Sequence, residues 1–475
     1  MGDTNPSRPP RLVIVSNRLA VTLKKKDGKY ISEPSSGGLV SSLSGISNTT
    51  DMRWFGWPGM NIEDPEERKV ANAALAENNA VGIFLEEELA HSHYNVFSNG
   101  IAWPILHYQS GVGFYEDAWV NYQKVNNVFA ETVADAVCSG DKIWVHDYHL
   151  FLVPRLLREK LQARGKKCPI GFTLHTPFPV YDFCRALPVQ DELLNGMLGA
   201  DVLGFHTDGY RKNFIESCEE GLDAKRTGDD IEYDGHKAHT GTFIVGIDPR
   251  KFTDCLQTEE TKKRIEEMRK IYDGKTVILG VDRLDYTKGL VQKLQGYDQF
   301  LREHPELKGK VVLIQVAIPS REDVKEYKEL KDQLHQLVGE ISGHHSTADG
   351  SPIAYMHHAV EFTDLASLYR IADICLINAR RDGMNLVAAE YVACQKDKHG
   401  VLVMSKFTGA ATFMHKGSIM FHPSSALQLS DALYEALTME PERKKKMYQE
   451  LEDFVYTNTS AEWGAKFTKA LESAS

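Results

Sequence analysis

Two acidic residues and a glycine follow a short apolar run in the second half of the chain. The run is Ile374–Ile377, and Asp382, Gly383 and Glu390 come after it, in the stretch Ala-Arg-Arg-Asp-Gly-Met-Asn-Leu-Val-Ala-Ala-Glu. Read as a strand, a tight turn and a helix start, this stretch offers free backbone N–H groups at the positive end of a helix dipole, which suits a phosphate. Its carboxylates could accept hydrogen bonds from sugar hydroxyls. An acidic N-cap followed by a surface glutamate explains the stretch equally well, so the rest of the chain has to decide.

A second candidate is a cationic turn about a hundred residues earlier. The β-branched run 275–281 leads directly into Asp-Arg-Leu-Asp-Tyr-Thr-Lys-Gly, which places Arg283 and Lys288 just before Gly289. Helical spacing over 290–301 follows. A solvated turn is the simpler reading, but paired cations between a buried strand and a helix start favour a phosphate ligand.

Histidines follow three successive predicted strands in the first half. The strands 142–145, 170–174 and 201–205 are closed by His146, His175 and His206. Asp147 follows the first of these histidines. Because ligands of open parallel sheets gather beyond the carboxyl ends of the strands, polar groups delivered there by three strands indicate a site.

The first strand adds further candidates at the same edge. Arg18 follows the run 11–16, and the double glycine Gly37-Gly38 looks like a turn entering a helix, so both are candidate anion contacts. The stretch 94–108 is rich in aromatic residues among Asn, Gly and His. Aromatic residues most often form core, but rings in such company also suit a carbohydrate.

The length and composition are those of an ordinary globular protein. At 475 residues two domains are expected, and alternating strands and helices predict two doubly wound α/β domains. The net charge of −11 argues against nucleic acid as the main partner. No apolar run has the length of a membrane span.

The seven cysteines are scattered and form no CxxC pair, which fits reduced thiols in the cytoplasm. The polar, proline-rich residues 1–10 predict a short disordered lead and no signal peptide.

The ordered set of motifs resembles one family, the trehalose-6-phosphate synthases of the fungal kind. The motifs are Ser-Asn-Arg at 16–18, Gly-Gly-Leu at 37–39, Trp-Phe-Gly-Trp at 54–57, the aromatic stretch 94–104, Val-His-Asp-Tyr-His-Leu at 145–150, Leu-His-Thr-Pro-Phe-Pro at 174–179, Gly-Phe-His-Thr at 204–207, the cationic turn 282–289 and Arg-Asp-Gly-Met-Asn-Leu at 381–386. The resemblance runs from about residue 11 to the end of the sequence. It implies a GT-B fold, in which two Rossmann-like domains face each other across a cleft.

The resemblance also implies domain bounds and an activity. An acceptor domain is expected over 11–250, a nucleotide-sugar domain over 251–455, and a final helix over 456–475 packing back on the first domain. The activity implied is retaining transfer of glucose from UDP-glucose to glucose 6-phosphate, giving α,α-trehalose 6-phosphate and UDP. No metal or other cofactor is implied, and UDP-glucose is a co-substrate. We expect no phosphatase domain after Ser475.

Site residues carry over by motif. The resemblance assigns the catalytic centre to Asp147, His175, Arg283, Lys288 and Asp382. It assigns the donor to Gly37, Gly38, His175, Arg283, Lys288, Val360, Asp382, Gly383, Met384, Asn385, Leu386, Val387 and Glu390, with Asp382 on glucose and Glu390 on ribose. It assigns the acceptor to Arg18, Tyr94, Trp103, Asp147 and Arg321. Trp57 and His206 are further candidates.

Two alternatives stay open at this point. A related transferase with another acceptor, such as a glucosylglycerol-phosphate synthase, would share the donor half. A non-catalytic regulatory homologue would bind sugar phosphates, although it would be expected to lack Asp382, Arg283 or Lys288, which are all present. The resemblance leaves open a homo-oligomer or a complex with phosphatase and regulatory subunits. Residues 342–351 depart from the family pattern, which puts the conformation of the loop expected over 342–352 in doubt.

Overall fold

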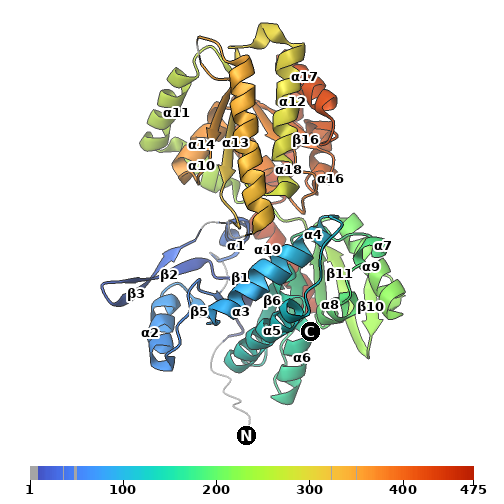
Figure 1. The fold of residues 1–475 in the computed structure, drawn as a ribbon. Coiled ribbons are helices and arrows are strands. Elements are labelled where there is room, and N and C mark those ends of the chain that lie inside the picture. Colours follow the sequence, from blue (N-terminus) through green and yellow to red (C-terminus); the bar gives the residue numbers. More distant parts are fainter. Residues whose placement is uncertain (1–8, 36, 48–50, 322–323, 349, 475) are drawn as a thin grey trace. The chain divides into compact units, whose positions relative to one another are not determined.

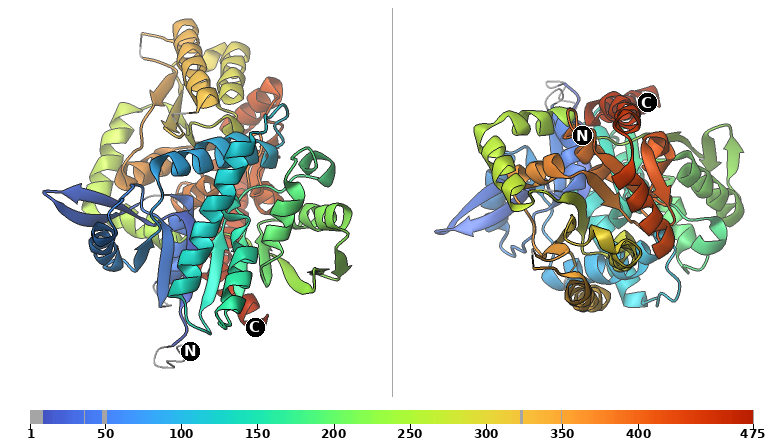
Figure 2. Two further views of the ribbon diagram at one scale, coloured as in Figure 1. Left: turned by 60° about the horizontal axis from the view of Figure 1, so that its bottom comes forward. Right: turned by 90° about the horizontal axis from the view of Figure 1, so that it is seen from above.

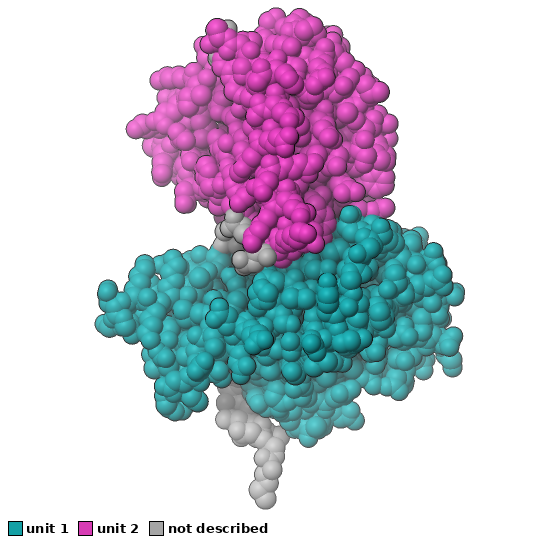
Figure 3. Space-filling view, viewed as in Figure 1, with its two compact units in different colours: residues 1–245, 460–475 teal, residues 246–459 magenta. Residues whose placement is uncertain are grey.

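The computed structural model describes residues 9–35, 37–47, 51–321, 324–348 and 350–474, so most of the predicted lead lies outside the described residues. The chain divides into two compact units (Figure 3). Unit 1 holds residues 1–245 and 460–475, and unit 2 holds residues 246–459. The sequence-based bounds of 250/251 and 455/456 lie within five residues of these divisions.

Unit 1 is built on a nine-stranded sheet. Its central strands are parallel and buried along their length, as the apolar run 12–15 requires of a strand covered on both faces. Only its last two pairings, β11 with β10 and β10 with β9, are antiparallel. In spatial order the strands are β5 (Ala80–Gly82), β4 (Met52–Trp57), β1 (Leu12–Arg18), β6 (Lys142–His146), β7 (Ile170–Thr173), β8 (Val202–Phe205), β11 (His236–Thr242), β10 (Asp230–Tyr233) and β9 (Lys225–Thr227).

Helices cover both faces of this sheet, and α5 and α6 pack side by side (Figure 2). Glycines allow the last helix to pack closely on the sheet, where Phe467 stacks on Trp144 at 4.2 Å between ring centroids. A Cβ on Gly171 or Gly204 would lie 2.5 or 2.9 Å from the Phe467 ring. The helices are α1 (Gly38–Ser47), α2 (Pro65–Ala76), α3 (Glu87–His91), α4 (Trp103–Leu106), α5 (Glu116–Ala136), α6 (Val153–Ala163), α7 (Tyr181–Cys184), α8 (Gln190–Met197), α9 (Asp208–Leu222) and α19 (Ser460–Ser473).

Unit 1 contains elements that the sequence analysis did not predict. A hairpin of β2 (Val21–Lys26) and β3 (Lys29–Pro34) turns at Asp27-Gly28, where both residues have positive φ (Figure 1). Asp-Gly is a strong local signal for such a turn. The aromatic stretch is helical: a π-helix, η1 (Ser92–Ala102), runs into α4.

Unit 2 is a doubly wound domain with six parallel strands. Their order is β14 (Ile353–Met356), β13 (Val311–Ile318), β12 (Thr276–Arg283), β15 (Ile374–Ile377), β16 (Val401–Ser405) and β17 (Ser418–Phe421). The chain winds outward from β12 to β14 and then returns to the other side at β15. The strand order therefore reverses between β12 and β15, and such a reversal opens a crevice at the carboxyl ends of the two strands.

Apolar cores lie on both faces of this sheet, under the helices. The helices are α10 (Pro249–Gln257), α11 (Glu259–Ile271), α12 (Leu290–Glu303), α13 (Lys325–His345), α14 (Phe362–Ile371), α15 (Leu386–Ala393), α16 (Ala411–Met414), α17 (Ala426–Thr438) and α18 (Pro441–Thr457). Short 3-10 turns are η2 (Tyr148–Leu150), η3 (Tyr286–Lys288), η4 (Pro305–Leu307) and η5 (His415–Gly417). Across the described ranges of both units, no helix combines the length and the apolar character of a membrane span.

Three local predictions in unit 2 were wrong. The sequence of residues 359–362 predicts a short strand, but residues 357–361 form a loop that leads into α14, and β14 lies earlier, where the buried Ile353 pairs with Leu313. Phe362 instead packs as a helical residue against Phe252, at 5.1 Å between ring centroids. The loop expected from 342 begins only after α13 ends at His345, whose ring nitrogen bonds to Asp298 at 2.7 Å. The apolar run 401–404 predicts the last strand of the chain, but β16 is followed by a further strand, β17.

Candidate functional site

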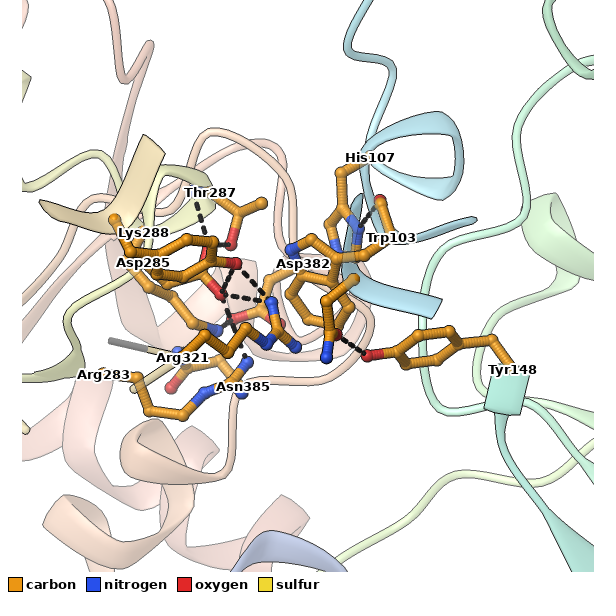
Figure 4. A network of polar contacts seen from close by, with 12 residues as sticks. Trp103, His107, Tyr148, Arg283, Asp285, Thr287, Lys288, Arg321, Asp382 and Asn385 are labelled. Carbon is orange, nitrogen blue, oxygen red and sulfur yellow. Dashed lines mark hydrogen bonds and ion pairs between the residues drawn. The ribbon is translucent and has the colours of Figure 1, made fainter. Parts of the chain in front are cut away.

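The predicted acidic and cationic stretches of unit 2 meet at the reversal of strand order. Lys288, which follows β12, donates from its ammonium group to Asp382, which follows β15, at 2.6 Å (Figure 4). Both side chains are about nine-tenths buried. Asn385 donates to the same carboxylate oxygen at 3.1 Å, and its own side-chain oxygen accepts from the Ala388 amide at the start of α15. The acid, the cation and the helix start thus form one hydrogen-bonded group.

A glycine allows the two loops to approach so closely. Gly289 has φ +62° and caps α12, and a Cβ there would lie 2.3 Å from the Asn378 carbonyl oxygen. Asn378 in turn donates from its side chain to the Gly289 carbonyl at 2.7 Å. Any other residue at 289 would need both a left-handed backbone and space that β15 occupies.

Asp285 organises the cations, and the sequence analysis gave it no role. It is fully buried; one carboxylate oxygen accepts from the amide and hydroxyl of Thr287, at 2.9 and 2.8 Å. The other oxygen lies 3.2 Å from the Arg321 guanidinium and 3.6 Å from that of Arg283. Burial alone would raise the pKa of Asp285, but Arg321, Arg283 and Lys288 outweigh it and lower that pKa to about 2. Its only sequence signal was a second acid inside the cationic turn.

Arg321 joins this group from the neighbouring strand. It follows β13 with φ +52°, an uncommon backbone conformation for arginine. Its guanidinium donates to the Tyr327 hydroxyl as well as to Asp285, and lies 5.4 Å from the centre of the Tyr327 ring. Three cations from two adjacent strand ends are therefore held around one carboxylate (Figure 4).

The far end of the group is Glu390 on α15. This half-buried carboxylate accepts a hydrogen bond from the Tyr369 hydroxyl at 2.7 Å, and burial raises its pKa. Gly383 is buried in the turn before α15. The other predicted donor residues in unit 2 lie partly buried against the apolar core on that face, namely Val360, Met384, Leu386 and Val387.

In unit 1 the three predicted histidines meet at the carboxyl ends of adjacent strands. His146 bonds to His175 at 3.1 Å between ring nitrogens, and His175 bonds to His206 at 3.0 Å. Asp147 has φ +74° and ψ 167°, a region almost reserved for glycine, and its carboxylate accepts from the His175 amide at 3.2 Å. Such strain costs about 1–3 kcal/mol and concentrates at functional sites.

The other predicted residues of unit 1 form aromatic pairs. The Arg18 guanidinium lies 4.7 Å from the centre of the Trp57 ring, whose buried N–H has no hydrogen-bond partner among the described residues. Tyr94 stacks on His149 at 5.6 Å between ring centroids. Trp103 is buried against His107 and Tyr148 (Figure 4). Gly37 and Gly38 are exposed at the start of α1.

The predicted residues thus fall into two groups. Unit 2 links Lys288, Asp382 and Asn385 by hydrogen bonds, and places Arg283 beside Arg321, which was predicted for the acceptor. Unit 1 brings together His175 and Asp147, and holds the remaining acceptor residues on η1, α4 and β1. Polar side chains at the carboxyl ends of largely parallel sheets, on two α/β units, fit the predicted GT-B fold.

Comparison with known proteins gives the family. Residues 10–473 match the sequence profile of glycosyltransferase family 20, and the chain belongs to that family. It is 44% identical over 98% of its length to an α,α-trehalose-phosphate synthase [UDP-forming] of Botryotinia fuckeliana, of which it covers 90%. A UDP-forming α,α-trehalose-phosphate synthase structure from Burkholderia vietnamiensis is similar with TM-score 0.87 and 31% identity, over 98% of each chain. The N-terminal domain of a Candida albicans trehalose-6-phosphate phosphatase is similar with TM-score 0.90 and 28% identity, over 100% of this chain and 99% of that one.

Proposed function

We propose that this chain transfers glucose from UDP-glucose to glucose 6-phosphate and releases UDP and α,α-trehalose 6-phosphate. The observation that carries the proposal is the hydrogen-bonded group of Lys288, Asp382 and Asn385 at the strand-order reversal of unit 2. It combines a cation for a diphosphate, a carboxylate for sugar hydroxyls and a helix start for an anion. The activity named for its relatives supports the same reaction.

The donor roles follow from this group. Arg283 and Lys288 hold the diphosphate, and the amides from Gly383 to Leu386 approach its phosphate and the sugar. Asp382 binds the glucose hydroxyls. At the other end, Glu390 binds the ribose, because its carboxylate lies on α15 beyond the helix start and is oriented by Tyr369. Val360, Val387 and Met384 line the site, with Val360 meeting the uracil through its backbone. Gly37, Gly38 and His175 are further proposed donor contacts.

The acceptor roles rest on the other predicted residues. Arg18, Tyr94 and Arg321 hold the 6-phosphate, and Trp103 and Asp147 hold the sugar. The strained backbone of Asp147 supports a functional role, since that conformation has a cost that the local hydrogen bonds must offset.

In the chemical step the bond between the glucose anomeric carbon and the UDP oxygen breaks, and a bond to an acceptor oxygen forms on the same face. We propose front-face transfer, in which the leaving phosphate takes the acceptor's proton. Double displacement would need a carboxylate beneath the anomeric carbon. Asp147, Asp382 and Glu390 are the possible nucleophiles, but all three are assigned to hydroxyl groups.

Charge on the leaving diphosphate is the main electrostatic demand. Charge-assisted hydrogen bonds from Arg283 and Lys288 contribute roughly 1.5–3 kcal/mol each. Loss of one that acts in the transition state slows turnover by roughly 10- to 100-fold. We therefore expect no metal or other cofactor to be required. Within the described ranges, no group of three or more His, Cys, Asp or Glu side chains is arranged to hold a metal ion.

Two variants test the division of roles. Asp147→Asn and Arg283→Ala should both lose most UDP release in the presence of both substrates. Only Arg283→Ala should weaken UDP binding measured by calorimetry, because Asp147 belongs to the acceptor. Equal UDP affinity in the Arg283→Ala variant and the unmodified protein would contradict the donor assignment.

A second experiment tests the acceptor. UDP release from UDP-glucose should be rapid with glucose 6-phosphate and slow with glycerol 3-phosphate. The reverse preference would indicate a glucosylglycerol-phosphate synthase.

The likeness to a phosphatase N-terminal domain supports a second candidate, a regulatory subunit that binds sugar phosphates without transferring glucose. It would bind UDP or glucose 6-phosphate in calorimetry and release no UDP with any acceptor. The presence of Arg283, Lys288 and Asp382 in one connected group favours the enzyme.

We also propose a cytoplasmic location, and a homo-oligomer or a complex with phosphatase and regulatory subunits. All seven cysteines are free thiols, which suits a reducing compartment. Light scattering of the purified chain tests self-association, and co-purification with tagged phosphatase tests the complex.

A further inference from the structure

A continuous chain of hydrogen bonds links the ends of β6, β7 and β8 in unit 1. It runs from His146 through His175 to His206, and ends at the Phe243 carbonyl, which lies 3.1 Å from Nδ1 of His206. Two of the rings also pack on tryptophans: Trp144 lies 4.7 Å from His146, and Trp463 of α19 lies 5.9 Å from His175, edge-on. The hydrogen bonds therefore hold the three rings in place, and His146 and His206 are buried.

The Phe243 carbonyl sets the tautomer of every ring in the chain. A carbonyl can only accept, so Nδ1 of His206 carries a proton, and in the neutral ring its Nε2 is left as an acceptor. Nδ1 of His175 must then be the donor to His206, which leaves Nε2 of His175 to accept. Nδ1 of His146 is the donor to that atom. All three rings therefore carry their proton on Nδ1.

This hydrogen-bonded row of histidines cannot pass a proton to another group. At its outer end, Nε2 of His146 is buried and has no hydrogen-bond partner among the described residues, and the same holds for the indole N–H of Trp463. At the inner end the carbonyl of Phe243 has no proton to give or take. A further proton on His206 would require the protons of His175 and His146 to move to Nε2, which would leave the N–H of His146 buried without an acceptor among the described residues. Burial, together with the neighbouring histidines, lowers the pKa of His175 well below 6.5, and burial lowers that of His146 to about 3, so both are neutral at pH 7.

We infer that the three histidines form a neutral, single-tautomer chain in which His146 and His206 act as positioning residues for the turn that holds Asp147. The link is the backbone of His175, whose amide donates to the Asp147 carboxylate at 3.2 Å. Fixing the His175 ring at both nitrogens fixes this amide, and through it a carboxylate on a strained backbone. The inference rests on the proposed acceptor role of Asp147 and extends it to two residues outside the substrate sites.

The first experiment reads the tautomers directly. In ¹⁵N-histidine-labelled protein at pH 7, long-range ¹H–¹⁵N correlation spectra should show a protonated Nδ1 and an unprotonated Nε2 for each of the three residues, with peaks assigned by single substitution. A protonated Nε2, or a charged ring, at any of the three histidines would contradict the inferred single-tautomer arrangement. This measurement needs no substrate, so it tests the tautomers independently of the proposed function.

The second experiment reads the positioning. His146→Leu removes the donor to His175, and kcat/KM for glucose 6-phosphate should fall by about 10-fold while UDP affinity stays the same. His146→Asn, whose side-chain N–H group can take the place of Nδ1–H, should recover most of the loss. His236→Leu is the control, because His236 bonds to the Ala200 carbonyl and contacts none of the three rings. Normal kcat/KM in His146→Leu, or a fall that His146→Asn does not restore, would overturn the positioning role.

Discussion

Asp285 offers the sharpest test of how the site is held together, and the informative change is Asp285→Asn. The substitution preserves the size of the side chain and leaves one oxygen that can accept from the Thr287 amide and hydroxyl. In the unmodified protein these two contacts are 2.9 and 2.8 Å long. It replaces the other oxygen by an NH₂ group, which faces Arg321 at 3.2 Å and Arg283 at 3.6 Å. Two attractive contacts are thus replaced by an N–H donor that faces the N–H donors of both arginines.

The size of the effect follows from the burial of this carboxylate. Removing one member of a buried ion pair costs about 3–5 kcal/mol, because the remaining charge is left uncompensated. Displacement of Arg321 and Arg283 from their positions removes one or two charge-assisted contacts with phosphate, at about 1.5–3 kcal/mol each. We therefore expect kcat/KM to fall by about 10²- to 10³-fold and both substrate affinities to weaken.

Three measurements check this expectation: UDP release under varied donor and acceptor, UDP binding by calorimetry, and urea unfolding. The matched control is Asp364→Asn, the same substitution in the same unit, where the carboxylate is partly exposed and pairs with Arg264 at 2.6 Å. Exposed pairs contribute at most about 1 kcal/mol, so this variant should keep its activity. Tyr327→Phe is a milder variant of the same network that separates its loss from simple unfolding. It removes a hydroxyl that accepts from Arg321 and donates to Asp285 at 3.3 Å, and should give a smaller loss in the same direction. A folded Asp285→Asn protein with kcat/KM near that of the unmodified protein would refute the reasoning.

Four further expectations follow from other contacts. Lys288→Met leaves the Asp382 carboxylate buried without its cation, so calorimetry should show UDP-glucose binding weakened by at least about 10-fold. Tyr369→Phe removes the hydrogen bond that orients Glu390, and should weaken UDP by about 5-fold but leave a 2′,3′-dideoxy analogue unaffected. The folded-state pKa of His146 is about 3, against an ordinary 6.5, so the unfolded chain binds more protons between these values. The free energy of unfolding, measured in urea, should therefore fall as pH is lowered through this window, and less steeply in His146→Asn. Treatment with EDTA should leave UDP release unchanged, and a loss restored by Mg²⁺ would contradict the proposed metal-free mechanism.

Local signals in the sequence were sufficient for the main elements of the fold. Buried parallel strands appear as continuous apolar runs, and β12, β15 and β16 lie where such runs predict them. The wrong assignments fall where a short apolar stretch suits two structures. Residues 359–362 could have formed a strand, but Ile353 occupies the edge of the sheet and Phe362 is needed by the helical layer. Packing between distant segments decides such cases, and no local pattern records it.

The candidate site shows the same contrast between what the local sequence predicts and what packing between distant segments decides. The sequence by itself determined which chemical groups stand at the strand ends: Arg283, Lys288, Asp382 and the three histidines were all found there, because in a parallel sheet the residues after each strand share one edge. Only the tertiary structure decided how these groups are paired. Asp285 became the common counter-ion of three cations, and Phe243 fixed the protons of three rings, through contacts between residues far apart in the chain. Hydrogen bonds and ion pairs depend on distances of a few tenths of an ångström, which are set by packing and not by spacing along the sequence.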